Sequence, residues 1–176
     1  MNILEKLSSL AVIAMAIAVV FTLWRSDFRT GAPRASAAQS ESALKGRTLD
    51  AHSIPQSGQK VTVVVGLSSK CTFCSRNLEL YQQLVALRSR DLRVVLAMPQ
   101  QKAEAESYAA EHQLSADAIV SSPLDKFFIT ATPTILVLDQ RSVVTSAWIG
   151  VLSETRRKDL LSHLMQQCRS CVPVGG

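Results

Sequence analysis

The sequence predicts an α/β domain, with a mixed central sheet flanked by helices, and an N-terminal transmembrane helix before it. Three observations support this prediction: two strand-like apolar runs at Val61–Leu67 and Leu92–Met98, a helical pattern between them, and a hairpin pattern over residues 134–149. The expected order β-α-β-α-β-β-α joins a crossover unit to a terminal hairpin, so parallel and antiparallel strands should share one sheet.

The N-terminal part is expected to lie outside this domain. After a short segment, residues 1–6, an uncharged and mostly apolar run extends over residues 7–24. As a helix this run would rise about 27 Å, which approaches the ~30 Å hydrocarbon core of a bilayer. We therefore expect an uncleaved signal anchor. A cleaved signal peptide is the alternative, because Ala35-Ser36-Ala37 resembles a cleavage site, although it lies well beyond the apolar run.

The charges that flank this span give conflicting indications of its orientation. Lys6 precedes it, whereas Arg25, Arg29 and Arg34 follow it, and this distribution favours a cytoplasmic domain. Long domains behind short N-terminal anchors nevertheless cross membranes largely regardless of charge. We expect a single-pass anchor with the soluble domain on the periplasmic or extracytoplasmic side. Residues 25–45, rich in Ala, Ser and Arg, are expected to form a flexible linker.

The folded domain is predicted over residues 46–167, beginning with a short extended segment at 46–49. The two apolar runs are rich in β-branched residues, which is typical of central strands covered on both faces. The later elements follow from the spacing of apolar residues: a helix after residue 74, a helix at 102–113, a short strand at 119–120, hairpin strands at 134–138 and 143–149, and a last helix. We expect Ser153 to cap this last helix, which should bury Leu160, Leu161, Leu164 and Met165.

A C-x-x-C motif, Cys71-Thr72-Phe73-Cys74, follows the first strand and opens the helical pattern. Two cysteines at this spacing can close and reopen a small disulfide, and the helix N-terminus and Lys70 should stabilise the thiolate of Cys71. Zinc sites use the same spacing, but a second pair, Cys168-Arg169-Ser170-Cys171, lies 93 residues further on. That separation exceeds the ~15–20 residues of a zinc ribbon. We expect thiol–disulfide chemistry, with no metal and no other cofactor.

These features together resemble the thioredoxin-like superfamily. The resemblance rests on the strand Val61–Leu67, the motif Cys71–Cys74, and Ala131-Thr132-Pro133-Thr134 leading into a strand. With the anchor and the lead-in at 46–49, the chain is most similar to membrane-tethered thiol–disulfide oxidoreductases of the TlpA/ResA type. The resemblance implies a thioredoxin-like fold over the predicted domain.

The resemblance also implies a role for each site residue. Cys71 would attack the partner and form a mixed disulfide, which Cys74 would then resolve. Pro133 matches the family's cis-proline, and the backbone of Thr132 would pair with an extended substrate segment. Lys70 and Phe73 would support the site, with Phe73 in a position where the family often has proline.

Two departures from the family pattern concern proton transfer. Val65 stands where thioredoxins carry a buried acid, and Asn77 stands where ResA-like proteins carry a glutamate. Both usual proton acceptors for the resolving thiol are therefore absent. The tail, residues 168–176, carries the second cysteine pair, Cys168 and Cys171. This pair is either a local disulfide, with Cys168 partly in the core, or a second redox pair that exchanges with the first.

The expected partners are protein thiols and disulfides, the membrane through the N-terminal helix, and in one scenario a membrane electron donor. The net charge of +5 is scattered along the chain, so nucleic-acid binding is not predicted. Two alternative functions stay open. One is a non-catalytic thioredoxin-fold module that binds a metal or a partner peptide. The other is a peroxiredoxin-like thiol peroxidase, suggested by Ser68-x-x-Cys71, although Val64 stands where that family has proline.

Overall fold

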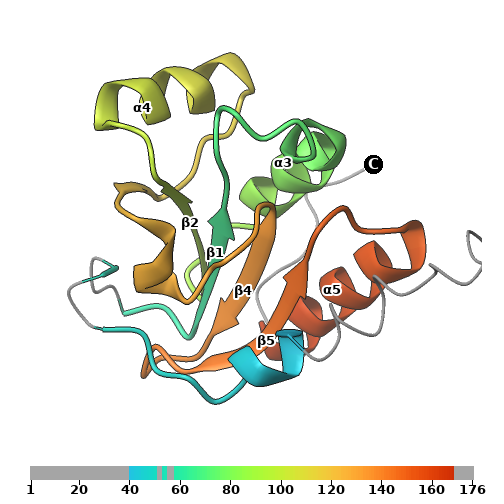
Figure 1. Cartoon of the computed structure of the whole chain (residues 1–176). Coiled ribbons are helices and arrows are strands. Elements are labelled where there is room, and N and C mark those ends of the chain that lie inside the picture. Colours follow the sequence, from blue (N-terminus) through green and yellow to red (C-terminus); the bar gives the residue numbers. More distant parts are fainter. Residues whose placement is uncertain (1–39, 51–52, 55–57, 169–176) are drawn as a thin grey trace, which may run out of the picture. The chain divides into compact units, whose positions relative to one another are not determined.

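A computed structural model describes residues 40–50, 53–54 and 58–168. Within these residues the strands form a five-stranded sheet in the order β3-β2-β1-β4-β5 (Figure 1). The strands are β1 (Val61–Gly66), β2 (Leu92–Met98), β3 (Ala118–Ser121), β4 (Thr134–Leu138) and β5 (Val144–Ile149). The helices are α3 (Leu78–Ala86), α4 (Lys102–Glu111) and α5 (Glu154–Gln167), with 3₁₀ turns η1 (Cys74–Asn77) and η2 (Leu124–Phe127).

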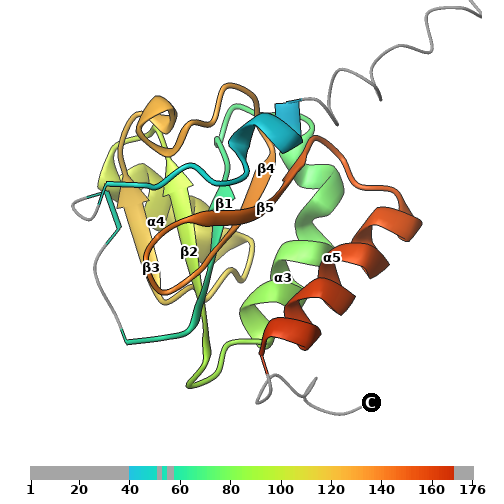
Figure 2. The same ribbon diagram turned by 90° about the horizontal axis from the view of Figure 1, so that it is seen from below.

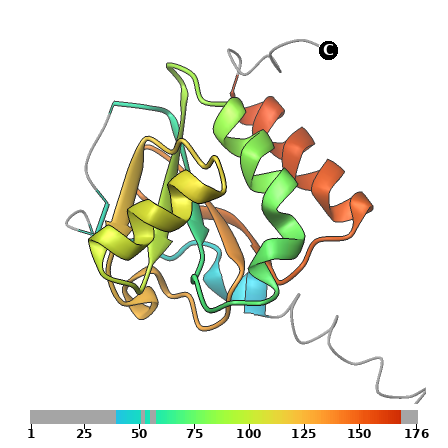
Figure 3. The ribbon, with the colours of Figure 1, turned by 90° about the horizontal axis from the view of Figure 1, so that it is seen from above.

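The sheet is mixed, as the sequence predicts. β1, β2 and β3 are parallel neighbours, whereas β4 runs antiparallel to β1 and β5 antiparallel to β4. The steps from β1 to β2 and from β2 to β3 go in the same direction, so right-handed crossovers place α3 and α4 on one face of the sheet. Figure 3 shows both helices on that face, together with α5.

The two faces of the sheet are covered in different ways. On the helical face, β-strand side chains pack against α3, α4 and α5 in one apolar cluster, which includes Val63, Val65, Leu84, Ala105 and Leu164. On the other face the cover is mostly irregular chain. Residues 44–50 and 53–54 and the segment around η2 supply it, through Leu44, Leu49, Ile54, Phe127 and Ile129. Figure 2 shows the N-terminal segment crossing this second face.

The N-terminal segment is fastened to the edge strand β5. Residues 40–44 are helical, Leu44 is buried, and Thr48 forms an antiparallel bridge with Val143. One carboxylate oxygen of Glu41 accepts the backbone N–H of Ile149 at 2.6 Å and also pairs with Arg156. The predicted linker, residues 25–45, therefore overlaps this packed segment over residues 40–45.

The rest of the predicted N-terminal organisation lies outside the described residues. This applies to the segment 1–6, the membrane span 7–24 and the first part of the linker. In the part of the chain that the structure describes, no helix has the length and apolar character needed to cross a membrane.

The last helix differs from its prediction in two respects. Ser153 does precede the helix with an extended backbone, but its side chain forms no capping hydrogen bond. Leu160 and Leu164 are fully buried, whereas Met165 is 46% exposed, so the expected burial of Met165 is wrong. At about 100° per residue, Met165 lies roughly 140° around the helix from Leu160, beyond the apolar stripe.

This difference gives a test of the packing of α5. We expect Leu164→Ala to lower the free energy of unfolding by about 2–5 kcal/mol, because it opens a cavity in the core. Met165→Ala on the same helix should change it by less than about 0.5 kcal/mol, since that side chain lies outside the buried stripe and opens no enclosed cavity. Urea unfolding followed by circular dichroism measures both variants, and equal effects would contradict the assigned face.

The docking of the N-terminal segment gives a second test. A chain that begins at Gly46 should unfold at a free energy about 1–3 kcal/mol lower than one that begins at Ser40. It loses the buried Leu44 and the charged acceptor of the Ile149 N–H. Glu41→Gln in the longer chain separates the charge from the packing. Indistinguishable unfolding curves for the two lengths would show that residues 40–45 contribute nothing to stability.

Candidate functional site

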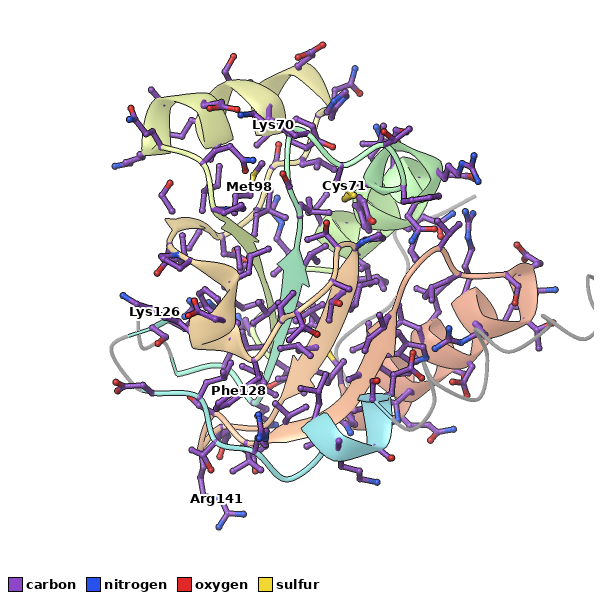
Figure 4. The ribbon with its side chains drawn as sticks, viewed as in Figure 1. Lys70, Cys71, Met98, Lys126, Phe128 and Arg141 are labelled. Atoms are coloured by element: carbon purple, nitrogen blue, oxygen red, sulfur yellow. A yellow bond between two sulfur atoms is a disulfide. The ribbon has the colours of Figure 1, made fainter. Side chains whose placement is uncertain are left out.

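Cys71 and Cys74 form a disulfide in the turn between β1 and α3, with their Cα atoms 5.4 Å apart. Figure 4 shows the sulfur atoms at the end of the sheet where β1 ends and β4 begins. Cys71 is half-buried, whereas Cys74 has no exposed surface. One sulfur is therefore accessible to another protein and the other is enclosed by the core, as the different roles implied for the two thiols require.

The helix begins later than the sequence suggests. A 3₁₀ turn starts at Cys74, and the first regular α-helical residue is Leu78. The Cys71 N–H donates to the carbonyl of Ser68, and the Cys71 carbonyl accepts the Cys74 N–H, each at 3.0 Å. Since the influence of a helix dipole falls off within the first turn, α3 acts on Cys71 less directly than expected. Lys70, which directly precedes Cys71 in the chain, is exposed.

The loop before the motif is held by residues at the start of α4. The Ser68 hydroxyl accepts a hydrogen bond from Gln100 Nε2 at 2.7 Å and one from the Lys70 N–H at 3.3 Å. Ser69 donates to a carboxylate oxygen of Glu104 at 2.6 Å. These contacts fix the loop that delivers Cys71 to the surface.

The loop before β4 turns back at the same end of the sheet. The Thr132–Pro133 bond is cis, which confirms the prediction for this bond. Gly66, the last residue of β1, pairs with Thr134, the first residue of β4. Pro133 is buried, and its carbonyl accepts the Gly150 N–H at 2.8 Å. Thr132 is half-buried, so part of this residue stays accessible beside the motif.

Asn77 connects the redox turn to this loop. The side chain is fully buried; its Nδ2 donates to the Gly150 carbonyl at 3.2 Å, and its Oδ1 accepts the Leu152 N–H at 3.3 Å. Gly150, with φ +84°, is the residue that also donates to Pro133. From the sequence, Asn77 stands out only because it is not an acid. The signal for its actual role is chemical, because an amide can donate and accept at once whereas a carboxylate can only accept.

The surroundings of the inner thiol are apolar. Val65 is fully buried in the same cluster as Cys74. Among the described residues no carboxylate is hydrogen-bonded to Cys74. The nearby Tyr81 hydroxyl is buried as well, and this burial raises its pKa above the usual range, so it stays protonated. The inner thiol therefore has no charged base beside it.

Arg157 of α5 provides a second connection to the redox turn. Its Nη2 donates to the Arg76 carbonyl at 3.1 Å, and its Nη1 lies 3.7 Å from a carboxylate oxygen of Glu79. The Glu79 side chain is largely exposed, so this ion pair contributes little to stability. The hydrogen bond to the Arg76 carbonyl instead holds η1 against α5.

The structure places Cys168 away from this site. Cys168 is buried and disulfide-bonded, and its sulfur lies 3.5 Å from the hydroxyl of Ser89. Ser89 follows the carboxyl end of α3, whereas Cys71 and Cys74 precede its amino end, and nine residues of helix rise about 13 Å. Direct exchange between Cys168 and Cys71 therefore needs a movement of the chain. Cys171 lies outside the described residues.

A cavity of about 1010 Å³ is not part of this site. Its lining residues include Lys126, Phe128 and Arg141, which Figure 4 places toward the other end of the sheet from Cys71. Among the described residues no group of three or more His, Cys, Asp or Glu side chains is arranged to hold a metal ion. A thiol–disulfide site reacts at a protein surface and needs no deep pocket.

Comparisons with known proteins agree with this architecture. No protein-family model and no curated protein sequence matches the chain. Among solved structures, it is similar to a DsbF homologue from Corynebacterium diphtheriae, with a TM-score of 0.50 at 15% identity over 60% of this chain and 72% of that one. It is also similar to a thiol-disulfide isomerase from Corynebacterium glutamicum, with a TM-score of 0.50 at 14% identity over 69% and 88% of the two chains.

A third similar structure is the exposed lipoprotein thioredoxin Etrx1 from Streptococcus pneumoniae, with a TM-score of 0.50 at 14% identity over 62% of this chain and 86% of that one. The structural neighbours are thus thioredoxin-like thiol–disulfide proteins. At these identities the likeness establishes the fold, and the chain has the thioredoxin-like fold that the sequence predicts.

The role of Asn77 gives a third test. We expect Asn77→Ala to lower the free energy of unfolding by about 2–4 kcal/mol, because it leaves the Gly150 carbonyl and the Leu152 N–H without partners. Gln82→Ala is the matched control, since Gln82 also donates a side-chain hydrogen bond from α3, to the His112 carbonyl, but is exposed. Its effect should stay within about 0.5 kcal/mol. Urea unfolding measures the free energy of both variants. An effect of Asn77→Ala as small as that of the control would show that the Asn77 hydrogen bonds do not stabilise the fold.

Proposed function

We propose that this protein is a membrane-anchored thiol–disulfide oxidoreductase that exchanges disulfides with protein partners through Cys71 and Cys74. The observation that carries the proposal is the asymmetric disulfide: Cys71 is accessible and Cys74 is enclosed, at the end of β1 where the cis-proline loop turns back. An exchange enzyme needs one sulfur that a partner can reach and one that only the first sulfur can reach.

The exchange can be written for the reduced protein. The Cys71 thiolate attacks one sulfur of a partner disulfide, and the other partner sulfur leaves as a thiolate that takes up a proton. Cys74 then loses its proton and attacks the sulfur of Cys71, so the first partner sulfur also leaves as a thiolate and the Cys71–Cys74 disulfide closes. Two electrons pass from the protein to the partner. The same steps in reverse oxidise a partner dithiol.

Proton transfer from Cys74 is expected to limit this sequence. Val65 and the neighbouring core provide no base for the enclosed thiol, and the Asn77 amide is used for hydrogen bonds to the 150–152 loop. A thiol in apolar surroundings is harder to ionise. The mixed disulfide with a partner should therefore live longer than in a protein with an acid beside the resolving cysteine.

The proposed membrane location rests on the sequence. Residues 7–24 have the length and composition of a single span, and the tethered domain would act on protein thiols and disulfides at the extracytoplasmic surface. In that position a membrane electron donor can reduce the Cys71–Cys74 disulfide again. Binding of nucleic acid has no place in this function.

A trapping experiment tests the proposal. Cys74→Ser should accumulate partner proteins as mixed disulfides on Cys71 in native membranes, because the resolving thiol is gone. Cys71→Ser should trap almost none, and Cys168→Ser should leave wild-type behaviour intact. If neither motif variant captures a partner and the wild-type disulfide resists reductant, the protein is a non-catalytic binding module. Rapid oxidation by peroxide without any trapped partner would point to the peroxidase alternative.

A further inference from the structure

We propose that the surface around Cys71 selects partner segments that carry a carboxylate and an apolar side chain close to their reactive cysteine. This inference rests on the proposed function and names the chemistry of the partner. The surface consists of Lys70, Phe73, Arg76 and Val151, together with the accessible part of Thr132, and is called here the docking surface.

The apolar part of the docking surface is formed by Phe73 and Val151. Phe73 is 55% exposed and Val151 is 40% exposed, and among the described residues Met165 is the one other large hydrophobic side chain with comparable exposure. Asn77 holds both neighbours of Val151, through the Gly150 carbonyl and the Leu152 N–H. Phe73 directly precedes the 3₁₀ turn that ends at Asn77. Asn77 thus joins the segment that carries Phe73 to the segment that carries Val151.

The charged part of the docking surface is positive. The Arg76 guanidinium lies 5.4 Å from the centre of the Phe73 ring, a cation–π contact that holds it beside this side chain. Arg76 and Lys70 are both exposed, and no described residue forms an ion pair with either.

The carboxylates near the docking surface already have partners. Glu104 accepts the hydroxyl of Ser69, and Glu79 is paired with Arg157. Neither Glu104 nor Glu79 forms an ion pair with Lys70 or Arg76, so both cations can meet a carboxylate of a ligand. A partner segment with a carboxylate complements this charge, whereas a segment with lysine repels it.

Strand pairing at Thr132 determines where that carboxylate sits. If a partner segment extends along Thr132, its side chains alternate between two faces, so residues two positions from its cysteine share the face of the cysteine. These residues are the ones that can meet Phe73 and Arg76. A preferred partner should therefore have an acidic residue two positions from its reactive cysteine on one side and an apolar residue two positions away on the other.

The test uses the reduced full-length chain in a non-ionic detergent and two synthetic peptides of equal length. Each peptide carries one cysteine as a mixed disulfide with 5-thio-2-nitrobenzoate, with Leu two positions away on one side and either Glu or Lys two positions away on the other. Attack of the Cys71 thiolate on the peptide sulfur releases the coloured 5-thio-2-nitrobenzoate anion, so absorbance gives the rate. We expect the Glu peptide to react about five-fold faster than the Lys peptide, as for one exposed ion pair. The preference should shrink at high salt.

Three variants locate the effect. Arg76→Glu should reverse the preference, and Phe73→Ala should slow both peptides. Arg141→Glu makes the same change in net charge at an exposed residue far from Cys71 in Figure 4, and should leave the preference unaltered. Equal rates for the two peptides, or an equal shift in Arg76→Glu and Arg141→Glu, would overturn the inference and leave the proposed function standing. If the wild type reacts with neither peptide faster than Cys71→Ser does, the proposed function itself fails.

Discussion

The site depends on the pairing at the end of β1. Gly66 pairs with Ala97 of β2 on one side and with Thr134 of β4 on the other, so the strand that leads to Cys71 and the strand that follows Pro133 meet there. Because side chains alternate along a strand, Val63 and Val65 face the helices, whereas Val64 faces the other apolar cluster. The register of β1 with β4 brings the cysteine motif and the cis-proline loop to the same end of the sheet.

Burial then separates the chemistry of two identical side chains. Cys71 ends an exposed turn, whereas Cys74 is enclosed beside Val65. The Asn77 amide stabilises this arrangement by joining the redox turn to Gly150, which in turn holds Pro133. A carboxylate at position 77 could accept a proton but could not donate to the Gly150 carbonyl. Position 77 thus joins two segments through an amide that both donates and accepts a hydrogen bond.

The unequal cover of the sheet links the N-terminal segment to the site. Three helices cover one face, and on the other face Leu44, Leu49 and Ile54 of the N-terminal segment pack together with the segment around η2. Glu41 fastens this cover to the Ile149 N–H, immediately before the glycine that contacts both Asn77 and Pro133. The segment that leads toward the predicted anchor is therefore attached to the domain next to the loop that forms one side of the site.

The sequence predicted the features that depend on residues close together in the chain. The strands at 92–98 and 134–138, the helix after the motif and the cysteine pair follow from local periodicity and spacing, and resemblance to a family added the cis bond at Pro133. The sequence did not predict four features: the docking of Glu41, the hydrogen bonds of Asn77, the exposure of Met165 and the distance of Cys168 from the site. Each depends on which distant segment packs against the residue, and local pattern carries no record of that partner. Folding alone brings Asn77 to Gly150 and keeps Cys168 at the far end of α3.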